Sequence, residues 1–338
     1  MHANEQALRS AATDWLLEED DECPTVRYLA LRDLLGKPET DADVRAARAA
    51  IPATGLVPRM LACMDTDAYR ERYPRFYTDK YRGLVWSLIT LAELCAPPDG
   101  RIATACEYLL THAQEPVDGG FSQHAAAGGA GGRRSEVIPC LTGNLVFAFS
   151  RLGYGEDPRV ARAADWLARF LRLNDGEETD PQAEPYRRYE MCWGAHTCHI
   201  GVVKALKAFA AIPPERRTGE VRAKTAEAAD FMLRHHVFRR SHDLGRVSKP
   251  GWKRFGFPLM YQTDALEILD ILSALGYRDA RMQGAIALTL DKRDARGCWP
   301  LENTYASERL LIPFGEADAP DKWITLRALR VLKRCAQD

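Results

Sequence analysis

The sequence predicts an all-helical protein, an (α/α)6 toroid of six inner and six outer helices around a central cavity. Three observations predict it: a repeat of about sixty residues, two kinds of helical stretch within each repeat, and a set of six apolar stretches. The chain has 338 residues, of which 46% are hydrophobic, enough for a large core. We therefore interpret 1–338 as one domain.

The repeat is visible when the chain is laid against itself. Segments such as RIATACEYLL and RVARAADWL have the same character in each repeat. The aligned apolar residues are separated by 58, 58, 61 and 61 positions, and they are Val44, Ile102, Val160, Val221 and Met282. A regular period indicates that one supersecondary unit recurs and stacks on its neighbours.

Two helical stretches alternate within each period. The stretch that begins at the aligned residue is amphipathic, whereas the one before it is apolar nearly all round, as in GLVWSLITLAEL at 83–94. A helix that is apolar on every side must be covered on every side, so these stretches predict the inner ring. They occupy 25–35, 81–94, 141–152, 199–211, 264–275 and 323–334. Five outer helices follow them, and 6–17 supplies a sixth that can pack against the last inner helix and close the ring.

A short turn element recurs after the outer helices. It reads DGGF at 118–121, Asn-Asp-Gly at 174–176 and RDARGCW at 293–299. Glycine permits the tight turn, and we interpret Phe121 and Trp299 as wedges between repeats. Residues 115–139 and 174–190 form longer loops before inner helices, which places both at one end of the ring.

Composition excludes several classes of protein. Lys+Arg 46 against Asp+Glu 47 gives a net charge of −1, so no general attraction to nucleic acid or anionic membranes is expected. We recognise no signal peptide and no apolar run long enough for a transmembrane segment. Nine cysteines are scattered through the chain, which argues against a disulfide framework and favours a cytoplasmic location. The oligomeric state stays open.

Several segments carry a family resemblance. They are PCLTGN (139–144), HTCHIGVVKAL (196–206), WKRFGFPLMYQTDALEILDIL (252–272) and DKWITLRALRVLK (321–333). With the aromatic–glycine repeats over 25–335, they resemble a bacterial branch of the prenyltransferase/squalene-cyclase repeat superfamily, the terpenoid cyclase-like α/α toroids. The resemblance implies the toroid and an apolar cavity. The Asp-x-Asp-Asp motif of class II terpene cyclases is absent, because the nearest match, DTDAY at 65–69, lacks the third carboxylate. The sequence therefore argues against squalene or oxidosqualene cyclisation.

Reactive side chains cluster where the inner helices begin. If these helices run in the same direction, their N-termini meet at one mouth of the ring. That mouth would hold Cys23, Asp79, Lys80, Cys140, Cys198, His199, Asp264 and Lys322. The partial positive charge of a helix N-terminus stabilises a thiolate, so we expect lowered cysteine pKa values there.

A zinc site is one interpretation of this cluster. The stretch 192–199 contains Cys192, His196, Cys198 and His199, and Cys140 is expected to face it from the neighbouring helix. We predict Cys140, Cys192, Cys198 and His199 as metal ligands, with three ligands suiting catalysis and four suiting structure. By resemblance, protein prenyltransferases bind zinc with Asp, Cys and His, and lanthionine cyclases with a Cys and an adjacent Cys-His pair. The alternative is that the cysteines are small wall residues and His199 is hydrogen-bonded.

Asp264 and His196 are the predicted catalytic residues. Asp264 opens the fifth inner helix, where it is either a cavity acid or an N-cap that accepts backbone N–H bonds. His196, on a loop, is a metal ligand, a general base or a bystander. Trp252, Phe257 and Tyr261 are predicted to line an apolar substrate pocket, with core packing as the alternative for each.

Two hypotheses for function follow. The first is a terpenoid cyclase- or prenyltransferase-like enzyme, a transferase or a cyclase/lyase, which is zinc-assisted and acts on an isoprenoid-like or thiol-containing small molecule. The second is a non-catalytic toroid that binds a small molecule or partner and carries a structural zinc site. An apolar cavity exposed to Asp264 and His199 would favour the enzyme, whereas a filled ring centre would favour the binding protein.

Overall fold

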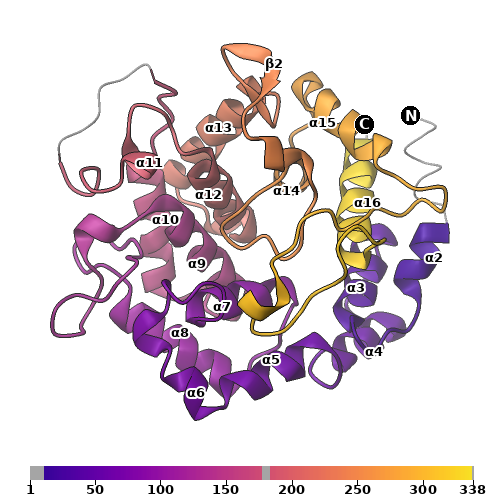
Figure 1. Ribbon diagram of the computed structural model, residues 1–338, viewed down its shortest axis with the longest axis horizontal. Helices are drawn as coiled ribbons and strands as arrows, with labels where there is room; N and C mark the ends of the chain where they lie inside the picture. The colour runs from indigo at the N-terminus through magenta and orange to yellow at the C-terminus, as the bar shows by residue number, and fades with distance from the viewer. Residues whose placement is uncertain (1–10, 177–182, 337–338) are drawn as a thin grey trace.

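All six apolar stretches form helices of an inner ring in the computed structural model, which describes residues 11–176 and 183–336. The inner helices are α3 (Pro24–Leu29), continued by the π-helical η1 (Ala30–Leu34), α7 (Leu84–Glu93), α9 (Pro139–Arg151), α12 (His199–Ala211), α14 (Ala265–Ala274) and α16 (Lys322–Ala336). The outer helices are α2 (Ala11–Leu17), α4 (Ala42–Ala50), α8 (Gly100–His112), α10 (Pro158–Phe170), α13 (Gly219–Arg234) and α15 (Gln283–Asp291). Figure 1 shows these outer helices at the periphery. The predicted all-α toroid is confirmed.

The ring closes through its first and last elements. Helix α16 packs against α3, η1 and α2, so the ends of the chain pair as the sequence predicts. Next to this junction, the hydroxyl of Thr25 in α3 donates a hydrogen bond to the carbonyl of Leu94 after α7, at 2.7 Å. Of the predicted outer stretch 6–17, residues 6–10 lie outside the described part of the chain.

Each later outer segment begins at a capping residue that follows the repeat. These caps accept hydrogen bonds from backbone N–H groups of the first turn, and they are Asp41, Asp99, Asp157, Thr218 and Asp279. Their separations of 58, 58, 61 and 61 residues equal those of the aligned apolar positions. A side-chain cap satisfies N–H groups that a helix leaves unbonded, so the repeat sets where these five outer segments start.

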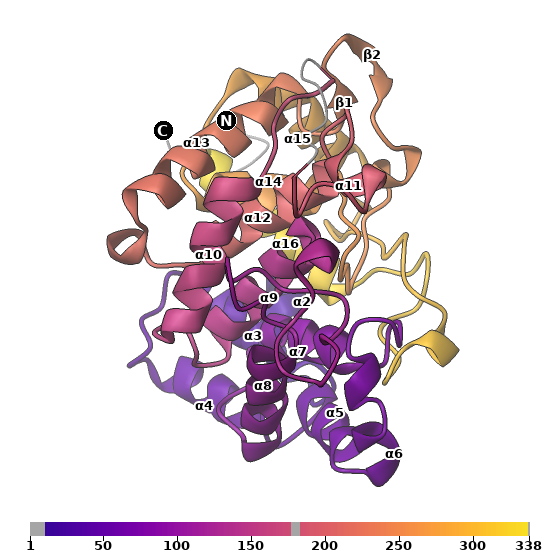
Figure 2. The ribbon, with the colours of Figure 1, turned by 90° about the vertical axis from the view of Figure 1, so that its left-hand side faces the viewer.

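Shorter elements complete the connections. They are α5 (Leu56–Met64), α6 (Asp67–Arg70), η2 (Tyr73–Arg75), η3 (Arg134–Glu136), α11 (Glu190–Trp193), η4 (Pro214–Arg216), the antiparallel strands β1 (Arg239–Arg240) and β2 (Asp243–Val247), η5 (Pro250–Lys253), η6 (Ala280–Met282) and η7 (Ser307–Arg309). Figure 2 shows α11, the β1–β2 hairpin and the long segment before α16 on the same side of the ring. Among the described residues, no helix combines the length and hydrophobicity needed to cross a membrane.

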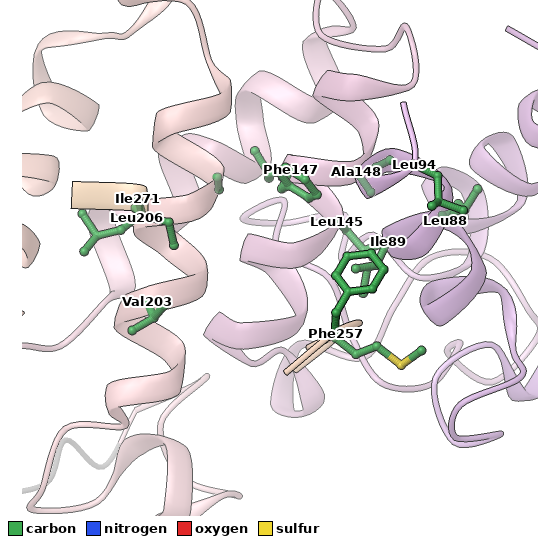
Figure 3. Packing of buried hydrophobic residues seen from close by; sticks show 14 of the residues in the cluster. Leu88, Ile89, Leu94, Leu145, Phe147, Ala148, Val203, Leu206, Phe257 and Ile271 are labelled. Carbon is green, nitrogen blue, oxygen red and sulfur yellow. The ribbon is translucent and has the colours of Figure 1, made fainter. Parts of the chain in front are cut away.

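The inner helices α9 and α12 approach most closely at a glycine. A Cβ atom on Gly143 would lie 2.4 Å from the carbonyl oxygen of Lys204, so only glycine fits without moving the backbone. Apolar side chains fill the remaining space between the inner helices. Figure 3 shows some of them, among them Ile89 of α7, Leu145 of α9 and Leu206 of α12.

Charged side chains cross the ring axis deeper in the core. The Lys204 ammonium, with its side chain 0% exposed, contacts both carboxylate oxygens of Glu267 at 2.7 and 2.9 Å. Lys207 lies 3.0 Å from the same carboxylate and also binds Glu93 of α7. Although burial alone would raise it, Lys204 and Lys207 hold the pKa of Glu267 far below its ordinary value. This axial ion network therefore joins α7, α12 and α14 through charges that are largely buried.

We expect Gly143→Ala to destabilise the protein by about 2 kcal/mol or more, because the added methyl group forces α9 and α12 apart. Gly284→Ala is the matched control, since a Cβ on Gly284 in α15 meets nothing within 4 Å. That variant should gain about 0.5–1 kcal/mol from reduced chain entropy in the unfolded state. Urea unfolding of both variants measures the difference, and equal stabilities would contradict the close approach.

Candidate functional site

The recurring turn element uses the same hydrogen bond in three repeats. In each, one backbone N–H of the turn donates to a threonine hydroxyl near the start of the next inner helix. The pairs are Phe121 to Thr142 at 3.0 Å, Asp175 to Thr197 at 3.2 Å and Trp299 to Thr325 at 3.0 Å. Phe121 and Trp299 are fully buried, as expected of wedges. In the middle repeat a carboxylate, Asp175, stands where the other two repeats place an aromatic ring.

Asp175 faces two histidines. Ligand atoms of Asp175, His199 and His235 all lie within 4.8 Å of one another. The His235 Nε2 atom is 3.4 Å from the Asp175 Oδ2 atom, and the two imidazole ring centroids are 4.3 Å apart. Within 11–176 and 183–336, no other three His, Cys, Asp or Glu side chains meet this closely.

Neighbouring groups fix the orientation of all three side chains. The His235 Nδ1 atom lies 2.8 Å from the Phe231 carbonyl oxygen, which can only accept, so Nδ1 carries a proton and Nε2 is the nitrogen available to a metal. The His199 Nδ1 atom is 3.1 Å from the Ser248 hydroxyl, and Ser241 donates to Asp175. Metal-binding histidines are commonly held in this way through the ring nitrogen that does not bind the metal.

The protonation state of His199 suits a ligand. Burial, helped by the nearby His235, lowers the pKa of His199 to about 3. The imidazole is therefore neutral at physiological pH, as metal binding requires. Two nitrogens and one carboxylate oxygen match the donor types that zinc prefers, and three protein ligands leave one coordination position open. The donor set fits a divalent ion of the zinc class.

Of the four predicted metal ligands, His199 belongs to this group, and the cysteines gather beside it. Cys198, which precedes α12, interacts with Cys140, and its sulfur forms a hydrogen bond with Cys192. That bond, with backbone N–H groups of α12, lowers the pKa of Cys198 to about 7. The set of four as one zinc site stays a prediction.

A lowered thiol pKa at the helix starts is seen only at Cys198 among the three cysteines placed there. Burial raises the pKa of Cys23 to about 12, and burial with the nearby Cys198 raises that of Cys140 to about 12. Loss of hydration outweighs the helix dipole at these two positions. All nine cysteines lie within the described residues, and each is a free thiol.

Asp264 is the N-cap of α14. It accepts hydrogen bonds from the backbone N–H groups of Glu267 at 2.7 Å and Gly256 at 2.8 Å, and it is 1% exposed. Burial raises its pKa to about 6, against the opposing effect of Arg327. The capping interpretation therefore describes its contacts, and its predicted catalytic role stays a prediction.

His196 lies near Asp175, His199 and His235, which are called the metal group below. A Cβ on Gly176 would be 2.8 Å from His196 Cε1, which places the imidazole against the residue after Asp175. His196 itself is exposed and keeps access to solvent. Its predicted catalytic role stays a prediction.

The three predicted substrate-binding aromatics lie in different environments. Trp252 contacts His199, with ring centroids 5.8 Å apart, and its buried Nε1 has no hydrogen-bond partner. Phe257 stacks on Trp323 in the core, at 4.4 Å. Tyr261 stands at the mouth, where the Lys80 ammonium lies 4.7 Å from its ring. Their predicted role in substrate binding stays a prediction.

The central cavity is charged, whereas the sequence predicts an apolar one. It has a volume of about 280 Å³ and is lined by residues of all six inner helices, mostly from their C-terminal halves. Lys207, Glu267 and Arg327 are among them. The aromatic cluster around Tyr81 and Trp86 leaves only about 10 Å³. Arginine and lysine side chains inside the ring thus replace the expected hydrocarbon surface.

Sequence reasoning missed Asp175, His235 and the axial charges. The signal for Asp175 was the absence of an aromatic residue in its turn element. His235 follows the outer helix α13 and carried no local signal. The axial charges recur at spacings of three residues inside apolar helices: Lys204 and Lys207, Glu267 and Asp270, Arg327 and Arg330. Such spacing puts both charges of a pair on one helix face.

Comparisons with known proteins concern the fold alone. No family model and no curated protein matches the chain. Among solved structures, a protein from Actinoplanes is 17% identical, with a TM-score of 0.46, covering 99% of this chain and 100% of that one. A variant of the type II terpene cyclase MstE from Scytonema, in complex with geranylgeranyl dihydroxybenzoate, is 14% identical, with a TM-score of 0.43, covering 99% and 98%.

Asp264→Asn should change the pH dependence of stability. Because the folded pKa of about 6 exceeds the ordinary 3.8, the contribution of Asp264 is complete below pH 3.8 and is lost as pH rises through 6. The neighbouring charges of Arg327 and Glu267 do not titrate in that range. The Asn variant should therefore gain about 2–3 kcal/mol relative to wild type between pH 4 and 7.5.

Urea unfolding at a series of pH values measures this gain. The control is Asp279→Asn, since Asp279 is also a helix cap but has its pKa lowered to about 2 by Arg281. Its difference from wild type should stay nearly constant above pH 4.5. If the stability difference between Asp264→Asn and wild type also stayed constant with pH, the raised pKa of Asp264 would be contradicted.

Proposed function

We propose that the chain is a toroidal metalloenzyme in which Asp175, His199 and His235 hold a divalent ion of the zinc class. The observation that carries the proposal is the convergence of three ligand atoms within 4.8 Å, at residues from a loop, an inner helix and the end of an outer helix. The outer partners of both imidazoles support it, because such contacts preorganise a ligand set before the metal arrives. Clusters of acidic residues on a protein surface usually lack such hydrogen-bond partners.

The surrounding residues suggest how the site would work. An ion bound there supplies a Lewis acid at its open coordination position. His196, which is exposed nearby, would accept the proton that a thiol or water loses on becoming a nucleophile. Ser241 and Ser248 keep Asp175 and His199 in position. This arrangement fits a transferase or a cyclase/lyase whose nucleophile must be deprotonated.

Of the two substrate classes that the sequence suggests, the geometry favours the thiol-containing one. An isoprenoid chain needs an extended apolar cavity, whereas the central cavity is lined largely by charged side chains. A thiol is a good zinc ligand and needs only access to the open position.

The alternative function is a non-catalytic toroid with a structural zinc site. One observation favours it: Asp264 is fully engaged as a helix cap, and the ring centre near the inner N-termini is filled by side chains. The two functions differ in whether the metal keeps a position open to added ligands.

Purified protein should contain about one equivalent of zinc per chain, and His235→Gln and Asp175→Asn should each lose most of it, because two remaining ligands bind zinc weakly. Mass-spectrometric metal analysis after dialysis measures the content. Cys192→Ser is the matched control and should retain zinc. Loss of zinc in Cys192→Ser, with retention in His235→Gln, would instead support the thiol ligand set predicted from the sequence.

Cobalt substitution distinguishes the enzyme from the structural alternative. Added small thiols should change the visible spectrum of the Co²⁺ protein and produce a thiolate-to-cobalt charge-transfer band, because the fourth position is open. Cys198→Ser should respond in the same way, which shows that the sulfur comes from the added thiol. A spectrum unaffected by thiols in both proteins would indicate a closed site and the non-catalytic function.

A further inference from the structure

The central cavity carries an excess of basic side chains. Six lining residues are basic and four are acidic. The basic residues are Arg32, Arg151, Lys207, Arg327, Arg330 and Arg334, and the acidic residues are Asp33, Glu93, Glu267 and Asp270. The cavity lies toward the C-terminal ends of the inner helices. Lys207 is eight residues beyond His199, about 12 Å along α12, so the cavity is separate from the metal group.

The acidic residues already have partners. Asp33 is paired with Arg330 at 3.1 Å. Asp270 is paired with Arg330 and Arg334, both at 2.7 Å. The carboxylates of the axial ion network are taken up by Lys204 and Lys207, as described above. No carboxylate of the lining is therefore left to attract a cation.

Two guanidinium groups of the lining are less fully paired than these. Arg151, at the end of α9, makes no ion pair with any described residue. Arg327 of α16 is 6% exposed, and its contacts are long: 3.8 Å to the Asp270 carboxylate and 3.5 Å to the Gly256 carbonyl oxygen. The buried Nε of Arg330 also lacks a hydrogen-bond partner. Arg32, by contrast, is bonded to Glu39 at 3.0 Å, away from the cavity.

Leaving buried N–H donors unpaired is unfavourable, and a guanidinium group is best satisfied by a carboxylate or phosphate that accepts two hydrogen bonds. We infer that the central cavity binds a small doubly charged oxyanion between Arg151 and Arg327, with the Arg330 Nε as a third donor. The volume of about 280 Å³ suits a small metabolite rather than a polymer or a lipid chain. Arg151 is exposed, so the ligand enters from that side.

This site is independent of the proposed metalloenzyme function, because it shares no residue with the metal group. The ligand contacts helices from opposite sides of the ring, α9 and α16. Its binding therefore adds a second charged link across the axis, beside the one that Glu267 makes. Dicarboxylates and phosphates share the required chemistry, and the experiment separates them.

Calorimetric titration with succinate and, separately, inorganic phosphate tests the inference, at constant ionic strength with acetate as the singly charged control. Wild type should bind at least one dianion saturably. Arg151→Gln should weaken that binding about tenfold or more, because a charge-assisted pair is lost. Arg151 is exposed, so this variant should fold. Arg45→Gln, an exposed arginine of the outer helix α4, is the matched control and should bind as wild type does.

A second readout locates the ligand. Cys95 lines the cavity and is half-buried, whereas Cys63 lies on α5 outside it. The bound dianion should slow the reaction of Cys95 with a maleimide and leave that of Cys63 unchanged. The inference is overturned if neither dianion binds saturably at millimolar concentration. It is also overturned if Arg151→Gln binds like wild type or if Cys95 is not protected.

Discussion

The contact on which the ring depends is the buried carboxylate of Glu267 between Lys204 and Lys207. An unpaired charge in this core would be strongly unfavourable, because the desolvation of either partner alone costs several kcal/mol. Helices α7, α12 and α14 must therefore meet in one register, since a rotation of any of them would separate the charges. Apolar packing alone tolerates more variation. Gly143 adds a second constraint, because it sets how closely α9 approaches the same segment of α12.

This network also explains why the two ends of the ring differ. Charged side chains fill the axis at the level of Lys204, between the inner N-termini and the C-terminal cavity. Toward the N-termini, the metal group sits between the inner helix α12 and the outer helix α13, away from the axis. Toward the C-termini, arginines exceed carboxylates and the cavity remains. The ring thus has room for the two proposed sites of different chemistry, one for a metal ion and one for an anion, which share no residue.

The sequence predicted the fold well because the fold follows local and periodic signals. Hydrophobic periodicity separated inner from outer helices, and a regular period placed caps such as Asp99 and Asp157. The candidate site depends instead on side chains that are far apart in the chain, such as Asp175 and His235, and no periodicity brings them together. The cavity was predicted to be apolar for a different reason. Helix α12 is apolar overall, and this average hid the fact that Lys204 and Lys207 lie on one face of it.

The repeats themselves provide a comparison that supports the metal group. Phe121 and Trp299 each bury an aromatic ring, which contributes about 2–3 kcal/mol through removal of apolar surface from water. Asp175 makes the same backbone hydrogen bond but forgoes that gain and brings a carboxylate into a partly buried place. Such an exchange is unfavourable for folding unless another interaction compensates. A hydroxyl from Ser241 and an imidazole from His235 compensate in part, and a bound cation would complete the compensation. A ligand is for this reason expected in the repeat that has Asp175 in place of a buried aromatic residue.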